Sequence, residues 1–344
     1  MHTGSARGLA EDRRYARRTL PRVSRTFALN IRVLGGTLGE AVRTGYLLCR
    51  AADTLEDAWP GPGAGRRFAT FQSALVGDDS AALALATEAQ ALGGGAELDL
   101  VAHLPRVLRV LRALPEEPRG FVVEGVRTLA SGMSRYATRA ASREGAAYLD
   151  DEAELEDYCW VVAGCVGVML TRLYAYAYRL PDDARQKKRL ELAPVVGRAL
   201  QLTNILLDWP SDLRRGRCYL PATWLAEQGL RPADLVERDR PGVRALAARL
   251  ERKAVEALLG VPDYLDLVPS RHLRYRLFCL WPAVWAVRSL RHARRDRQFP
   301  WGPRRPRLPR QEIYSTTFRS LVTAGRGPNL RGELRLIPLE SRTV

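Results

Sequence analysis

The segment TGYLLCRAADTLEDAWP, residues 44–60, decides the fold class predicted for this chain. Its polar residues Tyr46, Arg50, Asp53 and Asp57 are spaced by four, three and four positions, so on an α-helix they form one stripe. The positions between them are mostly leucine and alanine, which favour a helix packed against other helices. The segment therefore predicts a helix that carries a phenol, a guanidinium and two carboxylates on one face and ends before Pro60.

A second stripe of the same kind lies in QLTNILLDWPSDLRRGRCYLP, residues 201–221. Gln201, Asn204, Asp208 and Asp212 are spaced by three, four and four positions, and a group of arginines follows them. Pro210 lies between the two aspartates. Because proline lacks a backbone N–H, we expect a kink there that displaces Asp212 from ideal stacking on Asp208.

Most of the remaining sequence is also predicted to be helical, because alanine, leucine, arginine and glutamate dominate it. Glycine- and proline-rich stretches separate the helical segments, and strict polar–apolar alternation is too short to indicate a sheet. The expected fold is a single all-α domain over residues 1–294, followed by an irregular Arg/Pro-rich tail over 295–344. The expected helices include 37–58, 103–113, 121–137, 152–179, 185–208, 243–259 and 271–294.

The composition excludes several classes of protein. The chain has 344 residues, 54 Lys+Arg against 38 Asp+Glu, a net charge of +16 and 46% hydrophobic residues. This apolar fraction is that of a folded globular protein and is too high for a disordered one. The positive charge favours anionic partners, namely phosphorylated substrates, a membrane surface or nucleic acid. Because base-reading motifs are absent, nucleic acid is not expected as a partner.

Cysteine usage and hydropathy give an expected location. The five cysteines are scattered and odd in number, which predicts neither a disulfide framework nor a zinc site and favours a reducing compartment. The longest apolar run, at 158–170, is shorter than a membrane span, and the N-terminal residues lack the apolar core of a signal peptide. We therefore expect a cytoplasmic protein with no C-terminal hydrophobic anchor.

The two stripes together indicate a metal-dependent chemistry. A single DxxxD pair is usually a solvated helix face, but two such stripes in otherwise apolar helices favour a site. Mg²⁺ prefers oxygen ligands, and it is commonly held by one or two carboxylates completed by substrate phosphates. Two stripes facing each other across a helical bundle would bind Mg²⁺ ions, which would neutralise a diphosphate and make it a good leaving group.

Four segments of the sequence resemble the squalene/phytoene synthase family in order and spacing, over about residues 15–292. They are SRTFAL (24–29), RAADTLED (50–57), YCWVVAGCVG (158–167) and the second stripe with its arginines (201–221). The resemblance implies an all-α isoprenoid synthase fold, a helical bundle with a central substrate cavity. It also implies Mg²⁺-dependent head-to-head joining of two prenyl diphosphates.

The resemblance also implies roles for individual residues. Tyr46 and Tyr158 match family tyrosines of the pocket and of the proton or cation steps. The implied metal ligands are Asp53, Asp57, Asn204, Asp208 and Asp212. The implied diphosphate-binding residues are Ser24, Arg25, Phe27, Arg50, Gln201, Asn204 and Arg217.

A late segment resembles the squalene synthase branch, where a Phe-Cys pair precedes a proline. Phe278, Cys279 and Pro282 stand in those positions. The basic stretch that follows corresponds to a loop near NADPH in that branch, which assigns cofactor binding to Arg304, Arg305 and Arg307. The chain departs from the pattern at Leu207, where many relatives have arginine, at Ala283, where the branch has glutamine, and at Arg294-Arg295, where it has asparagines.

These observations predict a squalene synthase that uses two farnesyl diphosphates, Mg²⁺ and NADPH. The alternatives are a phytoene or dehydrosqualene synthase, or an enzyme that forms presqualene diphosphate or hydroxysqualene without hydride transfer. An alternative of another class is a basic helical module that binds lipid or nucleic acid. We expect a monomer or weak dimer, and peripheral contact with the cytoplasmic face of a membrane because the product is insoluble in water.

Overall fold

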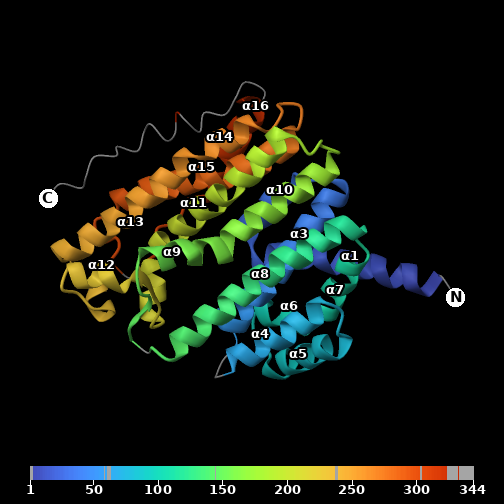
Figure 1. Ribbon diagram of the computed structural model, residues 1–344, viewed down its shortest axis with the longest axis horizontal. Helices are drawn as coiled ribbons and strands as arrows, with labels where there is room; N and C mark the ends of the chain where they lie inside the picture. Colours follow the sequence, from blue (N-terminus) through green and yellow to red (C-terminus); the bar gives the residue numbers. More distant parts are fainter. Residues whose placement is uncertain are drawn as a thin grey trace. The chain divides into compact units, whose positions relative to one another are not determined.

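The computed structural model describes residues 3–57, 59, 63–143, 145–236, 239–302, 304–323 and 332. Within these residues the chain is almost entirely helical, as predicted (Figure 1). It divides into two compact units. Unit 1 contains Met1–Thr138 and Val168–Gln186, and unit 2 contains Arg139–Gly167 and Lys187–Val344.

Unit 1 is built from short and medium helices around an apolar core. Ser24 begins the second helix, because its side chain accepts a hydrogen bond from the backbone N–H of Phe27, and Asp78 caps the fifth helix in the same way. Leu47, Leu48 and Leu55 are fully buried on the third helix. The helices are α1 (Thr3–Val23), α2 (Arg25–Arg32), α3 (Gly36–Asp57), α4 (Ala64–Leu75), α5 (Asp79–Leu92), α6 (Ala96–Ala102), α7 (Leu104–Arg112), most of α8 (Glu116–Ala141) and most of α10 (Cys165–Ala177).

Unit 2 combines long helices with a two-stranded parallel sheet that the sequence did not predict. Strands β1 (Ala147–Leu149) and β2 (Cys218–Pro221) are far apart in the chain, and they pair with Ala147 opposite Cys218. The longest helices are α11 (Ala184–Arg214), α13 (Pro241–Leu259) and α15 (Leu273–Arg295), of which α13 and α15 run side by side (Figure 1). The shorter elements are α9 (Glu152–Cys159), η1 (Trp160–Gly164), α12 (Ala222–Glu227), η2 (Pro232–Leu235), α14 (Val261–Asp266) and α16 (Arg310–Thr323).

Two sequence expectations about helices are wrong. The helix expected at 185–208 continues as α11 through Pro210 to Arg214, so proline does not end it. The neighbouring Trp209 is 3% exposed, and packing of this segment compensates for the missing hydrogen bond of the proline. The expected irregular tail contains helix α16, which begins directly after Pro309.

Glycines allow the η1–α10 segment and α11 to pack backbone to backbone, as their small size suggests. A Cβ atom added at Gly197 would collide with the carbonyl oxygen of Ala163, and one added at Gly167 would collide with that of Ala193. The η1 turn is π-helical and interrupts an otherwise continuous helix from Glu152 to Ala177. Such turns often occur next to functional residues, and Tyr158 lies just before this one.

The variant Gly197→Ala is expected to destabilise the fold by about 2 kcal/mol, because a backbone group cannot move aside as a flexible side chain does. Its thermal unfolding midpoint, followed by circular dichroism, should fall. Gly120→Ala is the matched control, since Gly120 is also helical but has open space where its Cβ would lie. That variant should be as stable as the wild type or more stable, because alanine is the better helix former. Equal midpoints for the two variants would contradict the proposed close packing.

Hydropathy and cysteines agree with a folded globular protein. Two stretches, Glu152–Ala177 and Ala184–Arg214, are long and apolar enough to pass a composition test for a membrane span. Core helices of water-soluble proteins pass the same test, so this is weak evidence for a span.

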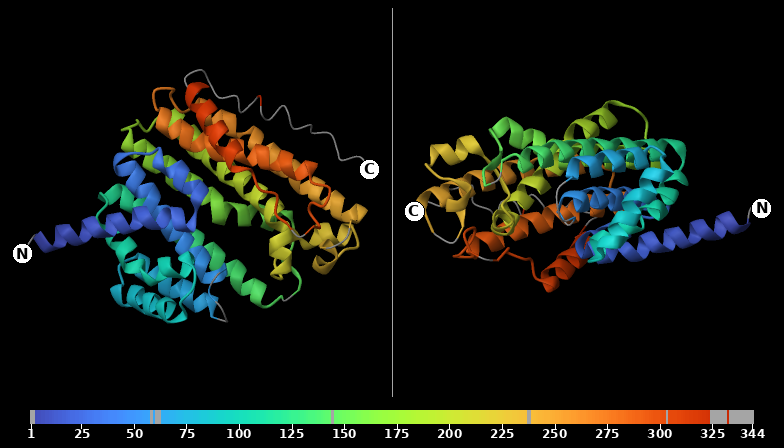
Figure 2. Two further views of the ribbon diagram at one scale, coloured as in Figure 1. Left: turned by 180° about the vertical axis from the view of Figure 1, so that it is seen from behind. Right: turned by 90° about the horizontal axis from the view of Figure 1, so that it is seen from below.

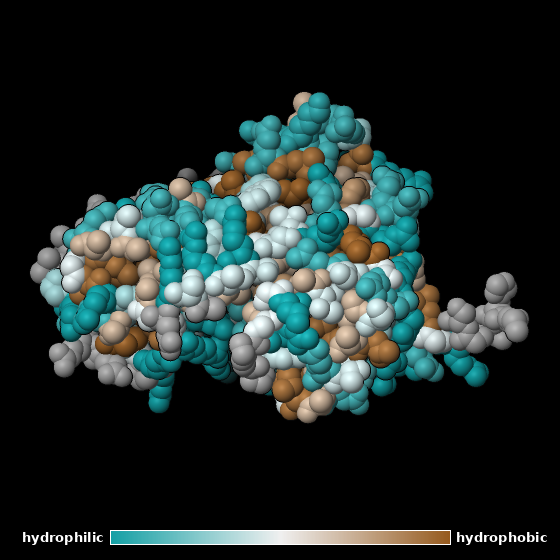
Figure 3. Space-filling model, turned by 60° about the horizontal axis from the view of Figure 1, so that its bottom comes forward, coloured by the Kyte–Doolittle hydropathy of each residue, from teal (hydrophilic) through white to brown (hydrophobic). Residues whose placement is uncertain are grey.

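All five cysteines lie in the described residues and none is in a disulfide, as predicted. Hydrophilic side chains cover most of the face drawn in Figure 3, with smaller hydrophobic patches between them.

Candidate active site

The first acidic stripe lies on α3 in unit 1, with the spacing predicted from the sequence. Asp53 and Arg50 are both half-buried, and Nη1 of Arg50 is 3.5 Å from Oδ2 of Asp53. The other terminal nitrogen of Arg50, Nη2, donates a 3.2 Å hydrogen bond to Oε1 of Glu97 on α6. Glu97 was not predicted as a site residue, because it lies 47 positions away in the sequence and belongs to no motif.

Arg50 retains a donor that is suited to an anionic ligand. Its Nε atom is buried and has no hydrogen-bond partner among the described residues. Burial by itself would lower the pKa of Arg50, but the negative charges of Asp53 and Glu97 outweigh this effect and raise it. The guanidinium is therefore permanently charged, and its unused Nε–H can donate to a phosphate oxygen.

Tyr46 lies one helical turn before Arg50, in a small cluster with residues of α2. Its ring is 5.2 Å from the ring of Phe27, measured between centroids. Burial raises the pKa of Tyr46 to about 12, although the hydrogen bond with Ser24 and the charge of Arg50 act in the opposite direction. Tyr46 is thus a neutral phenol at physiological pH. It can donate a hydrogen bond or present its ring to a cation, but it is not a preformed base.

The structure brings together five of the seven residues predicted in unit 1. Ser24, Phe27, Tyr46, Arg50 and Asp53 form the continuous group just described. By contrast, the side chain of Arg25 is exposed. The side chain of Asp57, at the last position of α3, lies outside the described residues.

The second acidic stripe lies on α11 in unit 2. Gln201, Asp208 and Asp212 are half-buried, whereas the predicted ligand Asn204 is exposed. Because α11 stays helical through Pro210, both aspartates are on the same helix, in the spacing that the sequence predicted. The kink expected at Pro210, with its displacement of Asp212, stays a prediction.

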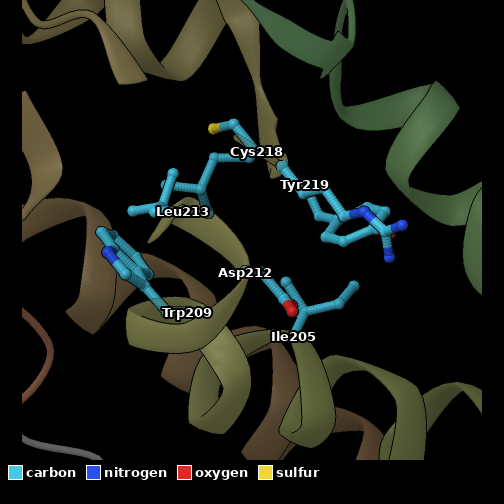
Figure 4. A pocket seen from close by; sticks show the side chains of 8 residues that line it. Ile205, Trp209, Asp212, Leu213, Cys218 and Tyr219 are labelled. Atoms are coloured by element: carbon cyan, nitrogen blue, oxygen red, sulfur yellow. The ribbon is translucent and has the colours of Figure 1, made fainter. Parts of the chain in front are cut away.

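Asp212 lines a pocket together with a basic and an aromatic residue. The pocket lies between α11 and β2, and Arg217 and Tyr219 are among its lining residues. Figure 4 shows Asp212 and Ile205 projecting toward the pocket from one helix, with Tyr219 on the opposite side. Gly216 makes the sharp turn between the two elements, with a φ of 74° that other residues adopt only with strain. This turn brings Arg217 back beside Asp212.

Three tyrosines cluster beside this pocket. The ring of Tyr158, a predicted site residue, stacks on that of Tyr219 with centroids 5.1 Å apart, and Tyr148 meets Tyr219 edge to face at 5.4 Å. Tyr148 and Tyr219 were not singled out from the sequence. They meet because β1 and β2 pair in parallel, which no local pattern shows. Together the three rings present a π-rich surface that can stabilise a cation.

The basic stretch of the tail reaches the second stripe. Nη1 of Arg305 lies 2.8 Å from Oδ1 of Asp208. The segment before it is held in place, since Phe299 is buried and Arg214 on α11 donates a 2.8 Å hydrogen bond to the carbonyl of Gly302. Arg304 and Arg307 are exposed.

The carboxylates suit Mg²⁺, although they do not form a closed metal cage. Among the described residues, no group of three or more His, Cys, Asp or Glu side chains is placed to hold a metal ion. Each stripe instead offers oxygen ligands next to an arginine, as in the Arg50–Asp53 and Arg305–Asp208 pairs. Mg²⁺ sites with one or two carboxylates completed by substrate phosphates have this composition. The expected facing of the two stripes stays a prediction.

Comparison with known proteins identifies the family. The sequence model of the squalene/phytoene synthase family matches residues 20–312 of this chain, which include both stripes and Arg305. The chain belongs to the squalene/phytoene synthase family. Members of this family are prenyltransferase-type enzymes that join prenyl groups head to head. The recognition of the family from four sequence motifs is therefore confirmed.

The relatives include enzymes of both branches. The chain is 43% identical over 111 residues to the phytoene synthase of Thermus thermophilus, a match that covers 32% of this chain and 35% of the relative. It is 26% identical over 281 residues to the Botryococcus squalene synthase of Botryococcus braunii, covering 79% and 56%. A bifunctional lycopene cyclase/phytoene synthase of Arthroderma gypseum is 28% identical over 239 residues, covering 65% of this chain and 37% of the relative. The matches to the phytoene synthases thus span only about a third of their length.

Solved structures confirm the isoprenoid synthase fold. The complex of TcSQS with the ligand BPH1237 superposes with a TM-score of 0.71 at 23% identity, covering 97% of this chain and 94% of that one. A dehydrosqualene synthase in complex with a ligand gives a TM-score of 0.66 at 19% identity, covering 96% and 98%. These similarities support the all-α prediction but do not separate the two branches.

Proposed function

We propose that this protein condenses two farnesyl diphosphates head to head through presqualene diphosphate to squalene, with Mg²⁺ and NADPH. The observation that carries the proposal is the buried, unpartnered Nε–H of Arg50 beside Asp53, because it supplies an anion donor next to a carboxylate. Family membership supports the reaction class. The basic tail that contacts the second stripe through Arg305 supports the squalene branch.

The first half of the reaction breaks the C1–O bond of one farnesyl diphosphate. When bound, Mg²⁺ would be held by Asp53, Asp57, Asp208 and Asp212 and would neutralise charge on the leaving diphosphate. Arg50 donates to the same diphosphate and orients it. The double bond of the second farnesyl diphosphate attacks the resulting allylic cation, and loss of a proton closes the cyclopropane of presqualene diphosphate.

The tyrosines act on the cationic species rather than as ionised bases. Tyr46 remains protonated because its pKa is about 12, so it serves as a hydrogen-bond donor or as a ring facing the cation. In unit 2, the stacked pair of Tyr158 and Tyr219 offers a second aromatic surface. An apolar lining around the prenyl tails would exclude water, which would otherwise capture the cation.

In the second half, the remaining diphosphate leaves and the skeleton rearranges. NADPH, when bound, would supply the hydride that completes squalene. The exposed guanidinium groups of Arg304 and Arg307 suit the 2′-phosphate that distinguishes NADPH from NADH. Arg294, one of the departures from the branch pattern, is engaged elsewhere, since it donates a 2.6 Å hydrogen bond to the buried Glu251. It therefore supports packing of α15 on α13.

Product analysis tests this assignment. With farnesyl diphosphate and Mg²⁺, the protein is expected to form squalene when NADPH is present and to stop before the reduced product when it is absent. The double variant Arg304→Ser/Arg307→Ser should raise the KM for NADPH about tenfold, while consumption of farnesyl diphosphate without NADPH stays unchanged. If NADPH does not alter the product, the squalene proposal is wrong.

A phytoene or dehydrosqualene synthase is the second candidate. It is favoured by the 43% identity to a phytoene synthase over 111 residues, and by the loss of branch-specific residues at Ala283 and Arg294-Arg295. This candidate predicts the same hydrocarbon with and without NADPH. Efficient use of geranylgeranyl diphosphate would then select the phytoene synthase, and its rejection would select the farnesyl-specific one.

A further inference from the structure

Helix α16 has its apolar side chains on the outside and its small polar side chains on the inside. Tyr314, Phe318, Leu321 and Val322 are between 49% and 70% exposed. Their spacing of four, three and one positions places them on one face. The opposite face presents Thr316, Thr317 and Ser320, which are at most 9% exposed. A surface helix of a water-soluble protein normally has the reverse orientation.

The buried hydroxyl groups of α16 are satisfied within the helix itself. Each donates to the backbone carbonyl four residues earlier: Thr316 to Glu312 at 2.6 Å, Thr317 to Ile313 at 2.8 Å, and Ser320 to Thr316 at 2.7 Å. Burial of this face therefore leaves none of these three hydroxyls unpaired. The orientation of the helix is compatible with the hydrogen-bonding needs of its inner side.

Polar contacts with α15 keep the helix in this orientation. Glu312, in the first turn of α16, accepts hydrogen bonds from Arg288 at 3.3 Å and from His292 at 2.7 Å, both on α15. Figure 2 (left) shows α16, in red, lying over α15. Rotation that would bury the apolar face would break both contacts with Glu312. The exposed apolar face is thus a fixed feature of unit 2.

Arginines border this apolar face. At 3.6 residues per turn, Arg310 and Arg319 fall on its two edges, and both are exposed. Arg304 and Arg307 are exposed in the segment that leads into the helix. Over residues 304–344 the sequence contains nine arginines and three glutamates. An apolar strip between cationic side chains matches the interface of an anionic lipid layer, where acyl chains lie beneath negative headgroups.

We propose that the face formed by Tyr314, Phe318, Leu321 and Val322 docks the protein on an anionic lipid membrane. A second copy of the chain is the less suitable occupant. A two-fold symmetric contact through this face would bring the arginines of both copies together, on proteins that each carry a net charge of +16. Docking requires no catalysis; its use in delivering a water-insoluble product to the membrane rests on the proposed function.

Binding of the full chain to lipid vesicles tests the proposal. The protein should bind vesicles of phosphatidylglycerol and phosphatidylcholine in equal parts, and bind vesicles of phosphatidylcholine alone much more weakly. Phe318→Ser/Val322→Ser should weaken binding to the anionic vesicles about tenfold or more, because two inserted side chains are lost. Val76→Ser/Leu83→Ser is the matched control, since these residues are similarly exposed in unit 1, and it should bind like the wild type.

Three further measurements separate the alternatives. Equal thermal unfolding midpoints for both double variants would show that any loss of binding is not a folding defect. Turnover of farnesyl diphosphate in detergent should be unaffected by Phe318→Ser/Val322→Ser, so failure of docking and failure of the proposed function are distinguishable. The proposal is overturned if Phe318→Ser/Val322→Ser binds the anionic vesicles as tightly as the wild type does. It is also overturned if the wild type binds no vesicles and instead forms a dimer in solution that this variant converts to monomers.

Discussion

Replacement of Asp208 by asparagine is expected to lower kcat about 1,000-fold while the protein remains folded. The substitution preserves size but removes a negative charge from the second stripe, so Mg²⁺ loses a ligand there. It also removes the charge that holds Arg305 at 2.8 Å. Steady-state consumption of farnesyl diphosphate over a range of Mg²⁺ concentrations gives the measurement, with circular dichroism as the check on folding.

A second site variant, Asp53→Asn, and a control variant, Asp239→Asn, accompany this prediction. Asp53→Asn should cause a loss of similar size, because the proposal assigns both stripes to one reaction. Asp239→Asn should be nearly silent, since Asp239 forms an exposed ion pair with Arg244 at 2.6 Å, and exposed pairs contribute little. Normal turnover by Asp208→Asn would remove this residue from the metal site. Normal turnover by both stripe variants, combined with steeply salt-dependent binding of polyanions, would favour the basic binding module instead.

The variant Arg50→Lys is expected to lower kcat/KM about 100-fold even though it preserves the positive charge. Lysine has no equivalent of the buried Nε–H, and a single ammonium group cannot contact Asp53, Glu97 and a diphosphate in the geometry of the guanidinium. Calorimetric titration with inorganic diphosphate in the presence of Mg²⁺ should show a parallel loss of affinity. This second readout separates a binding role from a structural one.

Arg13→Lys is the matched control for Arg50→Lys. Arg13 also contacts a carboxylate through two nitrogens, at 2.5 and 3.1 Å from Glu40, but it lies on α1 and away from the stripe. The two variants should therefore have similar unfolding midpoints and very different kcat/KM values. If Arg50→Lys turns over like Arg13→Lys, the diphosphate is bound elsewhere.

The long helices were predictable because the spacing of polar and apolar residues within one segment is enough to indicate a helix. In α3 the stripe Tyr46–Arg50–Asp53 follows from spacing alone, since residues three and four apart share a helix face and the leucines between them must be buried. The same rule identified the second stripe on α11. Local rules failed at Pro210, where the helix continues although proline inside a helix costs about 3 kcal/mol, and burial of neighbouring side chains such as Trp209 helps to offset that cost.

The partners of the stripe residues could not be predicted in this way. Glu97 meets Arg50 across 47 residues, and Tyr219 on β2 meets Tyr158 on α9 across more than 60 residues of chain. In the tail, a composition rich in arginine and proline suggested irregular structure. Helix α16 nevertheless packs on α15, and its Glu312 accepts hydrogen bonds from Arg288 and His292. Helix periodicity thus reveals which side chains share a face. Which groups neutralise, shield or expose that face depends on contacts between distant segments, and these form only when the chain has folded.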